Sequence, residues 1–330
     1  MSDDTLLSVQ DLVIQYETDD ALVRAVNGIS FELKRGETIA LVGETGAGKT
    51  TTALGLMRLV PDPPGRIVSG RVIFEGRDFL KAGKTEMRAH RGKDISMIFQ
   101  DPMTALNPIL TVGDQIAEVL RLHEKLSRAE SELKAIQMLR MVGIPEERHN
   151  EYPHQFSGGM KQRVVIAIAL ACNPHLLIAD EPTTALDVTI QAQVLALMDD
   201  LRKKYGTAMI LITHDLGVVT QICDKIAIMY AGQIVESGNL EAIYEKAAHP
   251  YTRGLFGSLP SLTSKVRRLK AIPGLMPDPS NLPAGCFFHP RCPDAMPSCS
   301  ARAPENIEIE PFHFVRCLLY GEGNKNGQTG

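Results

Sequence analysis

The residues with the clearest chemical potential form one glycine-rich run, Gly43-Glu44-Thr45-Gly46-Ala47-Gly48-Lys49-Thr50, which Thr51 follows. The run is a complete G-x-x-x-x-G-K-[ST] pattern, in which glycines let backbone N–H groups turn toward phosphate oxygens. Lys49 is expected to reach the β- and γ-phosphates, and the Thr50 hydroxyl to bind Mg²⁺. The apolar run 38–42 before the pattern is typical of a buried strand, and the spacing over 50–60 is typical of a helix. Strand, glycine loop and helix predict a nucleoside triphosphate site more strongly than an ordinary turn.

Two adjacent carboxylates, Asp180 and Glu181, end a second apolar run at 176–179. A carboxylate at the C-terminal edge of a parallel sheet lies where ligands collect. Asp180 is expected to hold Mg²⁺, directly or through water, and Glu181 to act as general base on the attacking water. An acidic turn would explain the pair if it stood alone, but the complete glycine loop upstream favours the catalytic interpretation.

A second possible anion site begins at Ser157, Gly158 and Gly159, which open an apolar helix. Ser157 is a natural N-cap, and the two glycines leave backbone N–H groups uncovered. Such a site makes sense if two copies sandwich the nucleotide, each completing the site of the other; simple helix capping is the alternative. Tyr16, at the end of an expected strand, could stack on adenine or be a half-exposed strand residue, and spacing does not decide between them.

The elements that must position these residues follow an alternating order. Residues 5–36 alternate apolar and polar positions and predict two antiparallel strands joined by a polar turn at 17–20, and 67–74 adds a further strand. Short strands are expected at 95–99, 176–179, 209–213 and 226–230, and helical patterns at 112–142, 164–171 and 190–205; a further segment, 216–222, separates the last two strands. This alternation predicts an α/β fold with a parallel sheet and helices on its faces.

Bulk properties limit the possible functions. A chain of 330 residues has room for one large domain and a smaller one. Its net charge of −4 gives no basic field that would point to nucleic acid. The longest apolar stretch, 164–172, is too short to span a bilayer, and the acidic N-terminus lacks the layout of a signal peptide. We therefore expect a cytoplasmic chain whose link to a membrane comes through a partner.

Beyond about Leu255, prolines interrupt every regular pattern, which indicates a loop-rich extension with too little apolar core to hold itself together. It carries four cysteines spaced C-x5-C-x6-C-x17-C: Cys286, Cys292, Cys299 and Cys317. Four thiolates can hold Zn²⁺ or a [4Fe–4S] cluster, although the C-x2-C knuckle of zinc ribbons is absent. Four unligated thiols are the alternative. His289 and His313 are expected to be ordinary loop residues.

Taken in order, these stretches resemble the ATP-binding subunit of an ABC transporter, over about residues 5–255. The resemblance implies that Tyr16 stacks on adenine and that Gln100 senses Mg²⁺ and a membrane partner. It also implies that Asp187, in the loop Ala185-Leu186-Asp187, couples two nucleotide sites, and that His214 contacts the γ-phosphate. Ser157-Gly158-Gly159 is similar to the family signature.

Further stretches, 100–108, 152–155, 185–193 and 249–252, are similar to the peptide and nickel importer branch, above all to the D-type ATPase of dipeptide and oligopeptide importers. The implied fold is α/β: a P-loop ABC-type nucleotide-binding domain over 1–255, then a C-terminal extension over 256–330 that carries the four cysteines. The domain would have a mostly parallel sheet core, an antiparallel β subdomain and a helical subdomain at about 101–165. Relatives of the dipeptide type carry an iron–sulfur cluster, so the resemblance favours [4Fe–4S] over Zn²⁺.

The implied function is the ATP-hydrolysing motor of an importer for di- or oligopeptides, peripheral on the cytoplasmic side of the cell membrane. Implied partners are two membrane permease subunits, a homologous F-type ATPase subunit or a second copy, and an extracytoplasmic solute-binding protein, with no nucleic acid. Nickel or another small solute is an alternative cargo. A soluble ABC-type ATPase acting on nucleic acid or ribosomes fits less well, because the 106 residues between Thr50 and Ser157 leave no room for a long coiled-coil arm.

Overall fold

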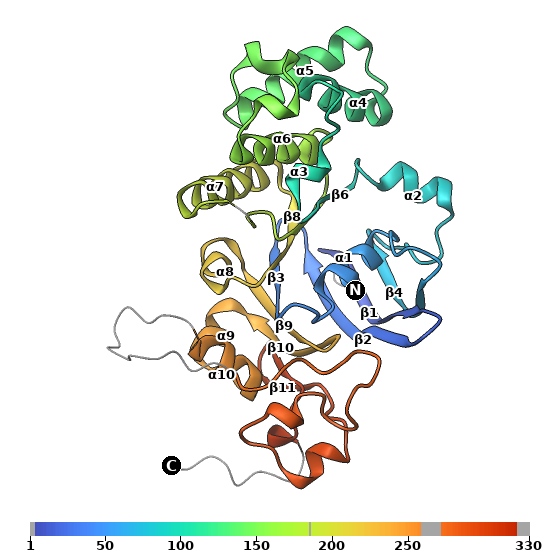
Figure 1. Cartoon of the computed structure of the whole chain (residues 1–330), viewed down its shortest axis with the longest axis vertical. Helices are drawn as coiled ribbons and strands as arrows, with labels where there is room; N and C mark the ends of the chain where they lie inside the picture. The colour runs from blue at the N-terminus through green and yellow to red at the C-terminus, as the bar shows by residue number, and fades with distance from the viewer. Residues whose placement is uncertain (1–3, 185, 259–271, 322–330) are drawn as a thin grey trace. The chain divides into compact units, whose positions relative to one another are not determined.

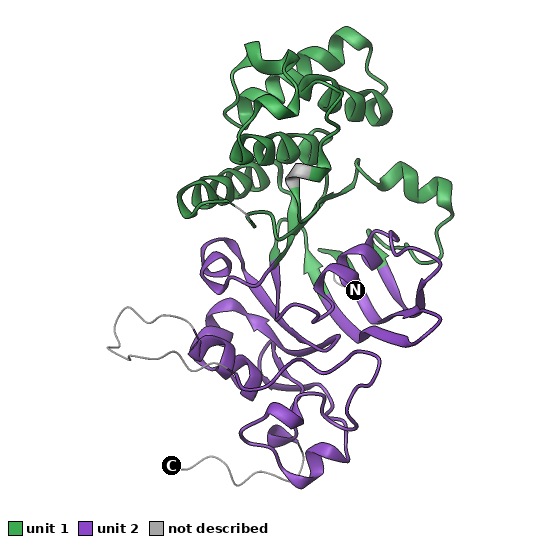
Figure 2. Cartoon of the chain, in the orientation of Figure 1, with its two compact units in different colours: residues 1–7, 32–38, 73–212 green, residues 8–31, 39–72, 213–330 purple. Residues whose placement is uncertain are grey.

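A computed structural model describes residues 4–184, 186–258 and 272–321 of the chain (Figure 1). Ala185, in the expected coupling loop, lies outside the described residues. The chain divides into two compact units, each built from separate stretches of sequence (Figure 2). The first unit contains residues 1–7, 32–38 and 73–212, and the second contains 8–31, 39–72 and 213–330.

Four strands form one sheet in the order β2-β1-β4-β5. Their bounds are β1 (Thr5–Glu17), β2 (Leu22–Lys34), β4 (Gly65–Phe74) and β5 (Arg77–Asp78). The turn between β1 and β2 is closed by a hydrogen bond of 3.0 Å from the Thr18 N–H to the Ala21 carbonyl. The last positions of β2 alternate between buried and exposed, as in a sheet with one face toward a core. The strands expected over 5–36 and 67–74 are thus confirmed.

In the first unit, three short strands run parallel to one another: β6 (Ile95–Ile98), β7 (Leu176–Asp180) and β8 (Ala208–Thr213). Ile178 in the central strand pairs with Met97 on one side and Ile210 on the other. All three strands are buried throughout, which is why they are continuous apolar runs in the sequence. Helix α6 (Gly158–Leu170) contacts β6 and α7 (Val188–Tyr205).

The helical pattern expected over 112–142 is two helices, α4 (Val112–Glu124) and α5 (Arg128–Met141). Lys125 ends the first in a left-handed conformation, with φ at 56°. Ser127 then caps the second, and the Glu130 carboxylate accepts a hydrogen bond from the Ser127 backbone N–H, which completes a capping box. The same unit holds α2 (Lys84–His90), α3 (Pro102–Ala105) and two 3-10 turns, Glu146–Asn150 and Pro153–Gln155.

In the second unit, five strands are neighbours in the order β11-β12-β10-β9-β3. They are β3 (Thr38–Val42), β9 (Lys225–Tyr230), β10 (Gln233–Asn239), β11 (Ile307–Glu310) and β12 (His313–Val315). β3 and β9 are parallel, whereas the remaining pairs are antiparallel. The helices of this unit are α1 (Lys49–Leu56), α8 (Leu216–Ile222), α9 (Leu240–Glu245) and α10 (Pro250–Gly257).

The extension that follows α10 is held by strand pairing. β12 adds to the edge of β10, with Glu236 opposite Val315 and Ser237 opposite Phe314. Between 272 and 306 the described chain is loop-rich, as expected, with 3-10 turns at His289–Arg291 and Pro297–Ser300. A third 3-10 turn, Leu318–Tyr320, follows β12.

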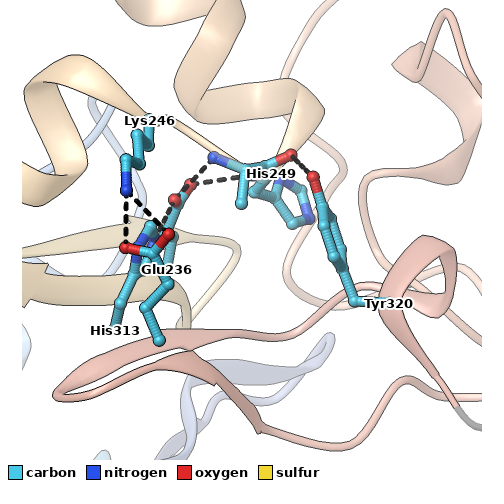
Figure 3. A network of polar contacts seen from close by, with 7 residues as sticks. Glu236, Lys246, His249, His313 and Tyr320 are labelled. Atoms are coloured by element: carbon cyan, nitrogen blue, oxygen red, sulfur yellow. Dashed lines mark hydrogen bonds and ion pairs between the residues drawn. The ribbon is translucent and has the colours of Figure 1, made fainter. Parts of the chain in front are cut away.

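A buried carboxylate strengthens this attachment (Figure 3). Glu236 on β10 is fully buried and accepts hydrogen bonds from the backbone N–H groups of Ala248 (2.7 Å) and His249 (2.8 Å). Its carboxylate also lies 2.8 Å from Nε2 of His313, which is buried on β12. The Tyr320 hydroxyl donates to the Ala248 carbonyl at 3.2 Å. The prediction that His313 is an ordinary loop residue was therefore wrong.

We expect Glu236→Ala to destabilise the second unit by about 3–5 kcal/mol, because it leaves buried donors without their acceptor. The matched control is Glu310→Ala, which breaks the exposed Lys246–Glu310 pair and should leave the unfolding midpoint nearly unchanged. Denaturant unfolding of both variants, followed by circular dichroism, measures the difference. Equal losses in the two variants would contradict the importance given to the buried carboxylate.

Candidate functional site

The glycine-rich run predicted to bind phosphate lies between β3 and α1 in the second unit, and we call residues 43–51 the phosphate loop. Lys49 is buried at the first position of α1, and its ammonium donates to the backbone carbonyls of Gly43 (2.7 Å) and Glu44 (3.1 Å). Thr50 is exposed in the first helical turn, where its hydroxyl is open to a ligand. The arrangement of strand, loop and helix that the sequence predicted is confirmed.

Two glycines fix the path of the phosphate loop. A Cβ atom at Gly43 would lie 2.2 Å from the Met229 carbonyl oxygen, and one at Gly48 would lie 2.4 Å from the Ala25 carbonyl oxygen. Gly48 also has a φ of 98°, which is unfavourable for other residues. The Ala47 carbonyl accepts a hydrogen bond of 3.0 Å from the Gly232 N–H, which ties the loop to the turn between β9 and β10. These contacts fix the backbone path of the loop.

An aromatic group lies beneath the phosphate loop. The Tyr251 hydroxyl of α10 accepts a hydrogen bond of 3.0 Å from the Glu44 N–H. The Tyr251 ring meets that of Tyr230 edge-on, with centroids 4.7 Å apart, and both contact Phe288 of the extension. All three rings are buried. Sequence reasoning missed this group, because its members come from three distant stretches of the chain.

Glu44 also meets the extension through its side chain. Nη1 of Arg291 lies 3.1 Å and 3.3 Å from the two carboxylate oxygens of Glu44. The Arg291 side chain is only 7% exposed. No sequence signal pointed to this pair, whose members are 247 positions apart.

Tyr16 and His214 complete the predicted residues of the second unit. Tyr16 is half-buried near the end of β1, and its ring packs against Gly65 at the start of β4. His214 is exposed and directly follows β8. Their roles in adenine stacking and γ-phosphate contact stay predictions.

In the first unit, the predicted general base contacts the predicted sensor glutamine. Glu181 Oε2 accepts hydrogen bonds from Nε2 of Gln100 (3.2 Å) and from the Thr184 hydroxyl (3.0 Å). Its backbone N–H donates to the Ile212 carbonyl at 2.9 Å, and its φ of 46° is uncommon for a residue with a side chain. Strained backbone of this kind is concentrated at functional sites. Asp180, one residue earlier, ends β7 and is 1% exposed.

The predicted signature also lies in the first unit. Ser157 is the N-cap of α6, and its hydroxyl accepts a hydrogen bond of 3.4 Å from the Met160 N–H. The predicted helix cap is therefore confirmed. Ser157 and Gly158 are exposed, which leaves the start of α6 open to an anion. Asp187 caps α7 by accepting from the Ile190 N–H at 2.9 Å, and Ile190 packs against Gly159. Signature and coupling loop thus contact each other.

The four cysteines of the extension lie near one another without forming a ligand set. The Cys286 N–H donates to the Cys299 carbonyl at 2.8 Å. Burial raises the pKa of the Cys286, Cys292 and Cys317 thiols, the last to about 11, and the neighbouring thiols add to this rise. No group of three or more His, Cys, Asp or Glu side chains among the described residues could hold a metal ion, so the predicted iron–sulfur or zinc site is not supported.

Mg²⁺ makes different demands, because it is usually held by one or two carboxylates together with phosphates and water. The buried carboxylate of Asp180 and the exposed hydroxyl of Thr50 suit that chemistry.

Across the described residues, no helix is both long and apolar enough to cross a membrane.

Two family models match the chain. The model described as "ABC transporter" matches residues 26–184, and that described as "Oligopeptide/dipeptide transporter, C-terminal region" matches residues 235–299. The oligopeptide transport ATP-binding protein OppD of Bacillus subtilis is 52% identical over 317 residues, covering 95% of this chain and 88% of that protein. This chain belongs to the ABC transporter ATP-binding proteins.

Other relatives agree with this assignment. The dipeptide transport ATP-binding protein DppD of Bacillus subtilis is 50% identical, covering 95% of this chain and 94% of the relative. Among solved structures, one similar to this chain is the dimeric post-hydrolysis state of the ATP-binding cassette MJ0796 bound to ADP and Pi. Its TM-score is 0.64 and its sequence identity is 26%. The match covers 71% of this chain and 98% of that chain. These matches confirm the predicted α/β fold class and the prediction that the chain is an ABC-type ATPase.

The pH dependence of the free energy of unfolding tests the capping of α10, the helix whose Tyr251 contacts the phosphate loop. His249 caps α10, and its Nδ1 accepts from the Tyr251 N–H at 3.0 Å. Burial, together with the charge of Arg253, lowers the pKa of His249 from 6.5 to about 3. The unfolded chain therefore binds one more proton between these values, so stability falls as pH drops below about 6.5, by at most about 1.4 kcal/mol per pH unit.

We expect His249→Asn, which offers an acceptor that does not titrate, to lose less stability than the wild type between pH 7 and pH 5. Urea unfolding at both values measures the two slopes. The exposed His154→Asn is the control and should keep the wild-type slope. A wild-type slope in His249→Asn would show that the buried cap does not carry the pH dependence.

Proposed function

We propose that this ABC-type ATPase is the motor subunit of an importer for di- or oligopeptides. The observation that carries the proposal is the continuity of the match: relatives named for oligopeptide and dipeptide transport are similar over the ATPase motifs and over the C-terminal region alike. The same motor carrying nickel or another small solute is the alternative cargo assignment. We also propose a boundary near residue 255 between the ATPase domain and the extension, and a helical subdomain at about 101–165.

In this proposal the phosphate loop holds the triphosphate of ATP, with Lys49 at the β- and γ-phosphates and Tyr16 stacked on adenine. Thr50, Asp180 and Gln100 would hold Mg²⁺, which would neutralise phosphate charge. The hydrogen bonds from Gln100 and Thr184 hold the Glu181 carboxylate in one orientation. Glu181 then accepts a proton from the water that attacks the γ-phosphorus, and ADP leaves.

The site is proposed to be completed by a second ATPase subunit. The open N-terminus of α6 in that second subunit, at Ser157 to Gly159, supplies the second anion site. Asp187 couples the two nucleotide sites, and His214 contacts the γ-phosphate. The partner is a homologous F-type subunit or a second copy of this chain. The solved relative MJ0796 is dimeric, which supports such an assembly.

Transport requires further partners. We propose that two membrane permease subunits bind the pair of ATPases at the cytoplasmic side of the membrane and that an extracytoplasmic solute-binding protein delivers the peptide. A [4Fe–4S] cluster or Zn²⁺ at the cysteines stays a prediction, which iron and zinc analysis of anaerobically purified protein decides. The proposed motor function does not depend on it.

The role of Glu181 gives a direct test. Glu181→Gln should bind ATP like the wild type but hydrolyse it about 100-fold more slowly or worse, because an amide cannot accept the proton of the attacking water. ATP-dependent dimers should accumulate, which size-exclusion chromatography detects. Glu147→Gln, at an exposed position of the same unit, is the control. Rapid turnover by Glu181→Gln would disprove the assignment of the base.

The cargo is tested with the complex reconstituted in vesicles together with its solute-binding protein. We expect di- or oligopeptides to stimulate ATP hydrolysis and nickel chelates to have no effect. Stimulation by nickel alone would replace the peptide assignment. Stimulation of the isolated subunit by DNA or ribosomes, with no response to peptides, would favour the soluble ATPase instead.

A further inference from the structure

The phosphate loop carries a carboxylate of its own, on Glu44. The backbone of this residue helps to shape the loop: its N–H donates to the Tyr251 hydroxyl, and its carbonyl accepts from Lys49 at 3.1 Å and from the Ala47 N–H at 3.1 Å. Its side chain is 32% exposed and faces Arg291. An acidic side chain in a loop that binds a polyanion opposes binding unless its charge is compensated.

Arg291 is held rigidly enough to supply that compensation. Its Nε donates to the Pro273 carbonyl at 2.8 Å, and its guanidinium carbon lies 5.7 Å from the centroid of the buried Tyr230 ring. These contacts leave Nη1 directed at both oxygens of Glu44. A guanidinium always carries its charge and presents its donors in a fixed plane, so it suits a permanent pairing role.

We propose that Arg291 is a positioning residue for nucleotide binding, which acts on the phosphate loop by fixing the Glu44 side chain and screening its charge. The inference rests on the proposed role of the phosphate loop. It assigns the extension a part in ATP binding, since Arg291 lies at the end of the 3-10 turn His289–Arg291. Arg291 does not touch the nucleotide in this proposal; its effect passes through Glu44.

The alternative is a purely structural role, in which Arg291 only holds the extension through Pro273 and Tyr230. The two roles differ in what happens when Glu44 loses its charge. If Arg291 screens Glu44, removing both charges restores binding. If Arg291 serves only the extension, removing the Glu44 charge brings no recovery, because the contacts with Pro273 and Tyr230 are still lost.

The test measures Mg-ATP affinity by calorimetry, and KM and kcat for ATP, on the full chain as wild type, Arg291→Met, Glu44→Gln and the double variant. We expect Arg291→Met to raise Kd and KM on the order of tenfold with kcat little changed, by exposing an unpaired carboxylate at the loop. Glu44→Gln completes the double-mutant cycle and reports the effect on Kd and KM of removing the loop carboxylate while Arg291 is intact. The double variant should recover to within about threefold of the wild type.

Two controls separate the possible failures. Arg302→Met, which removes an exposed arginine of the same extension, should bind Mg-ATP like the wild type. Lys49→Ala should lose affinity; if it does not, the phosphate loop assignment fails and this inference with it. The positioning role alone is overturned if Lys49→Ala fails to bind Mg-ATP while Arg291→Met binds it normally. It is also overturned if the double variant binds Mg-ATP as weakly as Arg291→Met.

Discussion

The second unit depends on close backbone packing around the phosphate loop. Gly43 lies against the Met229 carbonyl at the end of β9, and Gly48 against the Ala25 carbonyl of β2, at distances that no Cβ could occupy. A side chain at Gly43 would push the loop away from β9, and one at Gly48 would push it away from β2. Because the loop runs directly into α1, this packing also sets where the helix begins and where Lys49 stands. Its conformation is thus determined by the sheet, before any ligand contributes.

The carboxylate that we propose as the general base, on Glu181 in the first unit, is fixed by a comparable constraint. Glu181 adopts a left-handed φ that costs free energy, and its backbone bond to Ile212 helps to hold it there. This turn directs the side chain to Gln100 and Thr184 at the end of β7. Both halves of the proposed machinery therefore combine a short parallel strand with a tight turn in which backbone geometry, more than side-chain packing, places the reactive group.

The parts that the sequence predicted are those that depend on neighbours in the chain. The phosphate loop, the signature and the strand ending in Asp180 are consecutive residues, and their local pattern implies the conformation that the structure shows. Arg291 and His313 were missed or misjudged because their partners are 247 and 77 positions away and nothing local distinguishes them from solvent-exposed residues. The four cysteines are a different case, since their spacing indicates that ligands are available, and a metal bound by them stays a prediction.

The extension is attached by contacts that are continuous with the rest of the second unit. β12 covers the edge of β10, His313 contacts a carboxylate that β10 buries, and Phe288 packs beside Tyr230. Without the extension, β10 would present an unpaired edge and Glu236 would lose one of its partners, both of which are costly. The same segment delivers Arg291 to the phosphate loop. The extension therefore contributes to the stability of the second unit. It is linked to Glu44 through the ion pair with Arg291 and through Phe288, which packs against Tyr251.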